Sequence, residues 1–197
     1  LGKANLDRAL EAHPDHPFEI EWHPFQLNPD MAPEGVDKRK YLMERFGDEA
    51  KLEQIHQRFR DIAAQNGVKM DPDTPQRIPN TLNAHRLIHW AGLEGRQTLM
   101  VSALMRSYWV EGRDIGDLTV LADVAAQAGM DRAVVARLLA SDADTDVIQQ
   151  REAHARARGV SAVPTFLIAN KYVVSGAQPP EMLGKAIEEM TAAGPTA

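Results

Sequence analysis

The stretch from residue 159 to 181, GVSAVPTFLIANKYVVSGAQPPE, constrains the fold of this chain more than any other segment. Thr165–Ala169 is a short and nearly continuous apolar run, which is typical of a strand covered on both faces. A second β-rich run occupies residues 172–174. The Asn170-Lys171 pair between the two runs predicts a tight hairpin turn, because asparagine tolerates positive φ.

Prolines mark both ends of this hairpin. Pro179-Pro180 predicts the start of a helix over Glu181–Met190, since proline fits the first helical turn. Pro164 stands at the mouth of the first strand, where no ladder hydrogen bond needs its N–H. Two interpretations of Pro164 compete. A trans proline would merely start the strand, as the cis frequency of about 5–6% for X-Pro bonds favours, whereas a cis proline would indicate a functional loop.

The VPTFLI run, its hairpin, the SGAQ loop and the final helix together resemble the end of DsbA-family thioredoxin-fold proteins. They are most similar to the cytosolic FrnE-like dithiol oxidoreductases. Three other segments resemble this branch in the same order: Gly2-Lys3 at the start of an amphipathic helix, Glu19–Asp30, and Pro79–Gly92. The resemblance implies that the Val163-Pro164 bond is cis, faces a redox site and binds substrate backbone.

The resemblance implies an α/β thioredoxin-like fold with a large all-helical insertion between its second and third strands. Residues 1–30 and 159–197 would form the discontinuous thioredoxin-like domain, and residues 31–158 the insertion. Helical periodicity and glycines at helix ends support this division. The expected insertion helices are Val36–Phe46, Glu49–Asn66, Thr81–Leu93, Gln97–Glu111, Leu118–Ala128, Arg132–Ala140 and Thr145–Arg158.

A strand and a reactive turn are expected upstream of Leu1. Phe18, Ile20 and Trp22 alternate with polar residues, which predicts a half-exposed edge strand. The apolar strand at Phe166–Ile168 needs a paired neighbour, because an open interior edge leaves backbone groups unsatisfied. The resemblance places the first strand there, followed by a C-x-x-C pair at the N-terminus of the first helix. A thiolate in that place is stabilised by the helix dipole.

Composition excludes several function classes. The chain has 197 residues, a net charge of −6 and 44% hydrophobic residues. The negative charge argues against nucleic acid or anionic membranes as partners, and no apolar run approaches the roughly 20 residues of a membrane span. The absence of cysteine excludes a disulfide framework or thiolate metal site within these residues. We expect no metal and no cofactor, and the resemblance implies a cytoplasmic protein.

The HRLIH sequence at residues 85–89 superficially matches a zinc-protease helix. Arg86 replaces the glutamate that would act as general base, and it would place a cation beside the metal. The preferred interpretation is a half-buried helix with Leu87, Ile88 and Ala91 facing inward. The resemblance puts His85 itself on the helix that covers the active-site groove, where imidazole can exchange protons near neutral pH.

Two further residues are candidates for the substrate groove. Phe25 follows Pro24 at the end of the expected strand, in a loop that lies near the site in relatives. Gln178 is placed at the far wall of the pocket, although a polar loop residue before Pro179 needs no function. Trp22, Tyr108 and Trp109 are assigned to the core, where large aromatic residues are usually found.

Three functions are left open by the sequence. The first is a protein disulfide oxidoreductase or isomerase that acts on protein or small-molecule disulfides through the upstream cysteine pair. The second is a glutathione-dependent isomerase or transferase of the hydroxychromene carboxylate isomerase type, with an upstream serine. The third is a redox-inert thioredoxin-fold binding module. Monomer and homodimer both fit, the latter through the helical insertion.

Overall fold

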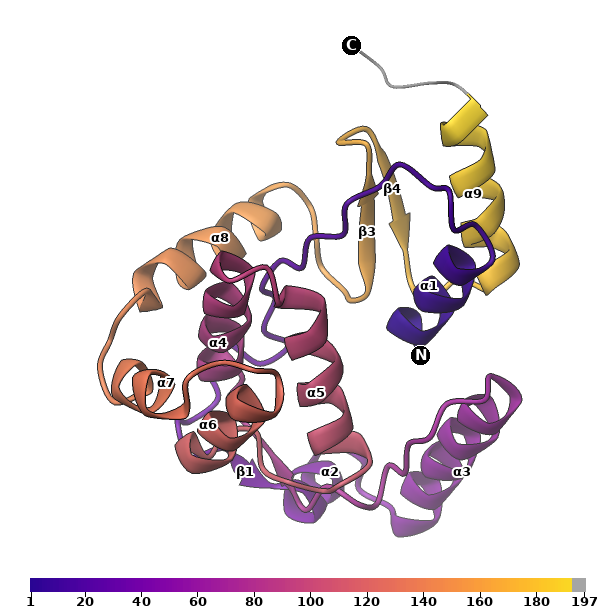
Figure 1. Cartoon of the computed structure of the whole chain (residues 1–197). Coiled ribbons are helices and arrows are strands. Elements are labelled where there is room, and N and C mark those ends of the chain that lie inside the picture. The colour runs from indigo at the N-terminus through magenta and orange to yellow at the C-terminus, as the bar shows by residue number, and fades with distance from the viewer. Residues whose placement is uncertain (193–197) are drawn as a thin grey trace.

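The computed structural model describes residues 1–192 and divides them into two parts (Figure 1). The terminal part contains α1 (Gly2–Glu11), β3 (Thr165–Ile168), β4 (Tyr172–Ser175) and α9 (Pro180–Ala192). The helical insertion contains β1 (Val36–Asp37), α2 (Lys38–Phe46), α3 (Glu49–Gln65), β2 (Arg77–Ile78), α4 (Leu82–Leu93), α5 (Gln97–Trp109), α6 (Leu118–Gln127), α7 (Arg132–Leu139) and α8 (Thr145–Ala157). The end of the predicted thioredoxin-like domain, residues 193–197, lies outside the described residues.

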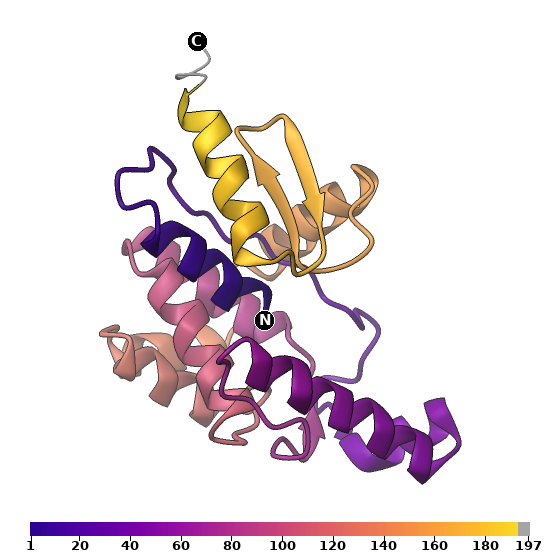
Figure 2. The same cartoon turned by 90° about the vertical axis from the view of Figure 1, so that its right-hand side faces the viewer.

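The terminal part joins the two ends of the described chain. Figure 2 shows α1 beside α9, and their shared core contains Ala9, Leu183 and Ile187. The leucines at 6 and 10 and Phe18 pack around this core. Leu183 and Ile187 have the i, i+4 spacing that places two side chains on one helix face. This packing fixes where α1 begins relative to the β3–β4 hairpin.

The β3–β4 hairpin forms, but its turn and burial differ from the prediction. β3 pairs antiparallel with β4, with Ile168 opposite Tyr172. The turn starts one residue earlier than expected, since Ala169 and Asn170 have φ of 51° and 55°. Leu167 is 51% exposed, so β3 is not covered on both faces by residues 1–192. Its expected neighbouring strand stays a prediction.

The expected edge strand around Phe18–Trp22 is not a strand in the structure. Its side chains do alternate between half-buried and exposed, as predicted. Within the described residues, no neighbouring strand pairs with the backbone of Phe18–Trp22. At Trp22, the side-chain amide of Gln97 makes the hydrogen bonds that a neighbouring strand would make. The N–H of Trp22 donates to Oε1 of Gln97 at 2.9 Å, and Nε2 of Gln97 donates to the carbonyl of Trp22 at 3.1 Å.

The main core lies in the helical insertion, between α4, α5, α6 and α7. Leu87, Met100, Leu121 and Val124 have no exposed surface. The helices end within one or two residues of their predicted bounds. Helix α2 begins two residues later than predicted, at Lys38, because Val36–Asp37 pairs with β2 instead. The glycines proposed to follow the helices all have positive φ: Gly47, Gly67, Gly95, Gly112, Gly129 and Gly159.

Arg86 is buried and joins α4 to the end of α7, a role that the sequence did not predict. The residue is 2% exposed. Its guanidinium donates to the carbonyls of Leu138, Ser141 and Ala143 at 2.7–2.9 Å, just after α7 and at its end. It also lies over the Trp90 ring, 4.9 Å from the centroid. The inward-facing prediction for Leu87 and Ala91 is confirmed.

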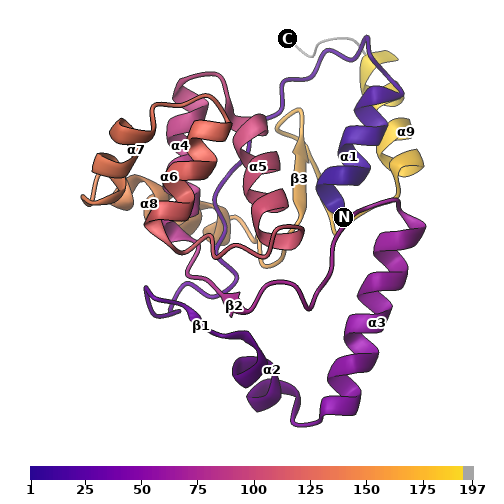
Figure 3. The same ribbon diagram turned by 60° about the horizontal axis from the view of Figure 1, so that its bottom comes forward.

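Helix α3 projects from the insertion toward the terminal part. Figure 3 shows the C-terminal end of α3 near the start of α1. The loop after α3 folds back along it, where His56 shares a hydrogen bond of 2.6 Å with Asp73. The N–H of Asp71 donates to the carbonyl of Trp109 at 3.3 Å, which connects this loop to α5. None of the helices within residues 1–192 combines the length and apolarity of a membrane span.

Candidate active site

The N-terminal end of α1 favours an anionic group. Leu1 occupies the N-cap position and gives no side-chain hydrogen bond to the helix, and the first turn holds no acidic residue. The first N–H groups of a helix have no partner inside the helix, and they lie at the positive end of its dipole. A thiolate or carboxylate placed here would therefore be stabilised.

Pro164 packs directly on this helix end. The Val163-Pro164 peptide bond is cis. A Cβ atom added to Gly2 would lie 2.5 Å from Cγ of Pro164, so only glycine allows this approach. Figure 1 shows the start of β3 and the start of α1 on the same side of the hairpin. The predicted functional loop thus contacts the first turn of α1.

Val163 presents free main-chain groups beside this contact. Its side chain is 44% exposed. Within residues 1–192, neither its N–H nor its carbonyl makes a hydrogen bond, whereas the carbonyl of Pro164 accepts from the N–H of Gly176 at 2.8 Å. Free main-chain groups of this kind can bond an extended peptide, as a strand edge does.

Asn5 and Gln178 close one side of the site. Asn5 is only 4% exposed, and its Nδ2 donates to the carbonyl of Gln178 at 2.8 Å. The Nε2 of Gln178 donates to the carbonyl of Ser175 at 2.7 Å, within its own loop. Gln178 therefore reaches α1 through its backbone, while its side chain holds the loop.

Phe25 and His85 form a separate group at the junction with the insertion. The guanidinium of Arg156 lies over the Phe25 ring, 4.1 Å from its centroid. Arg156 also donates to Glu152 at 2.7 Å and to the carbonyl of Gln26. The N–H of Gln26 donates to the same buried carboxylate at 3.0 Å. This network fixes the loop that carries Phe25.

The environment of His85 keeps its imidazole neutral. Burial lowers the pKa of His85 below its ordinary value, and a hydrogen bond with the Phe25 backbone and the charge of Glu152 oppose this only in part. A neutral imidazole has one nitrogen that can accept a proton and one N–H that can donate a proton. Within residues 1–192, no hydrogen bond or ion pair links His85 to Pro164 or to α1.

Helix α3 adds a wall that the sequence did not predict. A pocket of about 140 Å³ adjoins the start of α1. It is lined by Leu1, Asn5, Ile62, Asn66, Ala177 and Pro179. Ile62 and Asn66 are far in sequence from both halves of the terminal part, so no local pattern could have placed them here. Asn5 could have been identified from the sequence, because it is a polar residue on the buried side of an amphipathic helix.

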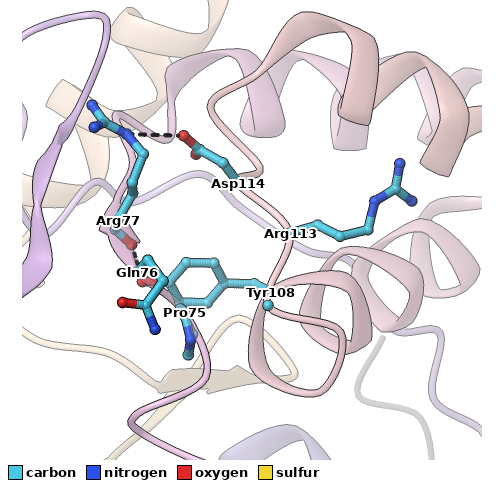
Figure 4. A pocket seen from close by; sticks show the side chains of 7 residues that line it. Pro75, Gln76, Arg77, Tyr108, Arg113 and Asp114 are labelled. Carbon is cyan, nitrogen blue, oxygen red and sulfur yellow. Dashed lines mark hydrogen bonds and ion pairs between the residues drawn. The ribbon is translucent and has the colours of Figure 1, made fainter.

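A second pocket, of about 230 Å³, lies in the insertion (Figure 4). Arg77 and Asp114 form an ion pair of 3.2 Å at one side, and the hydroxyl of Tyr108 donates to the carbonyl of Arg77 at 2.8 Å. Arg113 points away and pairs with Asp123. Burial raises the pKa of Tyr108 to about 12, so the phenol stays protonated. These groups pair with one another and leave no nucleophile.

Glu53, His56 and Asp73 lie close enough together to contact one ion. Arg60 already pairs with both carboxylates. Although partial burial opposes it, hydrogen bonds and charges from His56 and Arg60 lower the pKa of Asp73. Because the guanidinium supplies the positive charge that a metal would bring, this cluster is an ion-pair network on α3 and its return loop.

The family of the chain follows from its match to a known domain model. The model for the DSBA-like thioredoxin domain matches residues 1–188. The chain belongs to this family. The predicted α/β thioredoxin-like fold with a helical insertion is therefore confirmed.

Relatives of this DSBA-like chain extend the comparison. A probable DsbA oxidoreductase from Streptomyces coelicolor superimposes with a TM-score of 0.86 at 29% identity, over 100% of this chain and 85% of that one. The uncharacterized Bacillus subtilis protein YwbO is 26% identical over 96% of this chain and 89% of its own length. A 2-hydroxychromene-2-carboxylate isomerase shares the fold, with a TM-score of 0.70 at 20% identity, over 98% of this chain and 92% of that one. Oxidoreductase chemistry is supported at the level of the family.

Proposed function

We propose that the protein is a thiol-disulfide oxidoreductase or isomerase of the DsbA type and that exchange takes place at the N-terminus of α1. The packing of the cis Pro164 against Gly2 at this uncapped helix end carries the proposal. None of the 197 residues is cysteine, so both thiols would come from residues outside this sequence. The FrnE-like branch and a cytoplasmic location belong to the same proposal.

The proposed step is ordinary thiol-disulfide exchange. A thiolate at the helix end attacks one sulfur of the substrate disulfide, and the other substrate sulfur leaves as a thiolate. A second thiol of the protein then attacks the mixed disulfide, which releases the reduced substrate and leaves a disulfide in the protein. The free N–H groups of the first turn stabilise the attacking thiolate by lowering its pKa.

Val163 supplies the proposed substrate contact. Its unpaired N–H and carbonyl can bond the backbone of an extended segment on one side of the reacting sulfur. The bond from Asn5 to the Gln178 carbonyl holds the neighbouring loop against α1. Substrate and helix end are thereby kept in a fixed relation, as efficient bond exchange requires.

The test replaces Pro164 in the full-length polypeptide. We expect Pro164→Ala to slow insulin reduction and the isomerisation of a scrambled disulfide protein at least ten-fold. Pro14→Ala, an exposed proline in the loop after α1, is the matched control. Unchanged rates for Pro164→Ala would refute the substrate role. A full-length sequence without a cysteine pair directly before Leu1 would exclude the exchange mechanism itself.

A glutathione-dependent isomerase is the second candidate. The observation that favours it is the fold shared with the 2-hydroxychromene-2-carboxylate isomerase, and a serine at the helix end would suffice to stabilise a bound glutathione thiolate. Calorimetric titration of the full-length protein with glutathione separates the two proposals. Saturable binding without insulin reduction would support the isomerase.

A further inference from the structure

We infer that the C-terminal end of α3 forms a specificity pocket for an apolar side chain of a polypeptide substrate, next to the reacting sulfur. This inference rests on the proposed function, because it assigns a substrate class to the same site. The pocket adjoins Leu1, the residue before the Gly2 that packs on Pro164. A group held there would lie beside the first turn of α1.

The size and lining of the pocket suit a branched aliphatic side chain. Its volume is about 140 Å³, close to the roughly 150 Å³ of an apolar cavity that accommodates benzene. Four of its lining residues are apolar, namely Leu1, Ile62, Ala177 and Pro179. Such a pocket favours the substrate side chain that buries more apolar surface in it.

The apolar surface continues beyond the pocket along α3. Ile55, Phe59, Ile62 and Asn66 have the spacing of a single helix face. Phe59 is 45% exposed, although phenylalanine is usually buried. Phe59 borders the buried residues of α3, Leu52, His56 and Ala63, which lie on the side of the return loop. Ile55 and Ile62 are half-buried and Phe59 is exposed, so this face keeps apolar surface that extends the site away from α1.

The position of this wall is held by charged groups. Arg60 pairs with Glu53 on α3 and with Asp73 on the return loop. The N–H of Asp71 ties that loop to the carbonyl of Trp109 at the end of α5. A wall fixed in this way can select among substrates, because it cannot simply move aside for a polar side chain.

A polypeptide fits these observations better than a small aromatic molecule. Side chains of an extended peptide alternate in direction, so a chain bonded to Val163 can direct a neighbouring side chain into the pocket. In the described chain, Oδ1 of Asn66 accepts no hydrogen bond, while its Nδ2 donates to the carbonyl of Ile62 at 2.8 Å. Oδ1 of Asn66 can therefore accept a hydrogen bond from a peptide N–H. A small aromatic could fill the pocket but would leave Phe59 and Val163 without a partner.

The test compares two mixed-disulfide peptides that carry leucine or serine next to the cysteine. Single-turnover reduction by the reduced full-length protein should favour the leucine peptide about ten-fold or more in kcat/KM, the usual effect of an apolar pocket. Ile62→Asn should bring this ratio close to one. Ile62→Trp should fill the pocket and remove the preference by lowering kcat/KM for the leucine peptide. Leu99→Ser, an exposed leucine on α5, is the control and should keep the wild-type ratio.

Binding gives a readout that does not need the thiols. The same peptides with serine in place of cysteine are titrated against the full-length protein by fluorescence anisotropy. A leucine preference in binding without turnover would support the pocket and refute the exchange reaction. Turnover of both peptides at equal rates, unaffected by either Ile62 variant, would overturn the pocket and leave the reaction standing. Saturation by a naphthoate probe with no binding of either peptide would also overturn it.

Discussion

Adding one methyl group at Gly2 tests the contact on which the proposed site depends. In the Gly2→Ala variant the new Cβ would lie 2.5 Å from Cγ and 3.1 Å from Cβ of Pro164. Carbon atoms in favourable contact are about 3.5–4.0 Å apart, so the methyl group is about 1 Å too close. A proline ring cannot rotate away, and the first turn of α1 must therefore move from the loop.

The expected cost follows from two opposing effects. Overpacking of this kind costs about 1–3 kcal/mol. Alanine recovers at most about 1 kcal/mol through its better helix propensity, and less in a first turn. We expect a net loss of about 1–2 kcal/mol in the free energy of unfolding, which lowers Tm by about 2–8 °C for a chain of this size.

Urea unfolding followed by circular dichroism measures this loss. Gly92→Ala is the control, because Gly92 lies in the last turn of α4 and its added Cβ would lie 3.3 Å from Nε2 of Gln97, a contact that a shift of a few tenths of an ångström relieves. It should leave stability unchanged or slightly higher. Equal stability of Gly2→Ala and wild type would refute the close packing of Pro164 on α1.

Three further predictions concern residues outside the first turn of α1. Arg86→Met removes the donor to the carbonyls of Ser141 and Ala143 and should destabilise the protein by about 2 kcal/mol in urea unfolding; a loss below about 1 kcal/mol would show that these bonds contribute little. Because burial lowers the pKa of His85, the unfolded chain takes up a proton near its ordinary pKa of about 6.5 that the folded protein resists. Stability should therefore fall as the pH drops below about 6.5, and His85→Gln should flatten this dependence in unfolding curves recorded from pH 5 to 8. Gln97→Leu should speed hydrogen exchange at the Trp22 amide about ten-fold or more, measured by NMR, whereas an unchanged rate would show that the side-chain bond is absent in solution.

The sequence predicted those features that depend on neighbouring residues. The glycines after the insertion helices adopt positive φ. Aspartate favours the N-cap position, and Asp117 and Asp131 accept hydrogen bonds from the first turns of α6 and α7. Both features depend only on residues within one helical turn. The family resemblance added the order of the two parts and the position of the cis proline.

The features that escaped prediction depend on contacts between distant residues. The burial of Arg86 was not predicted, because the carbonyls that it binds lie more than 50 residues away. Ile62 joins the site through a return loop whose path no local pattern encodes. The strand expected at Phe18–Trp22 has the correct alternation, but a strand also requires a partner backbone, and Gln97 offers only one amide.

That single amide has a mechanical consequence. The side chain of Gln97 bonds both main-chain groups of Trp22, and the Trp22 indole N–H donates to the hydroxyl of Thr98 at 3.0 Å. The start of α5 is thereby pinned to the segment that leads out of α1. Sliding the insertion along this segment would break all three bonds together, whereas a small rotation about the pin would strain them little. Rotation about Trp22 is opposed in turn by the bonds that Gln26 makes with Glu152 and Arg156, so two separate sets of bonds hold this segment against the insertion.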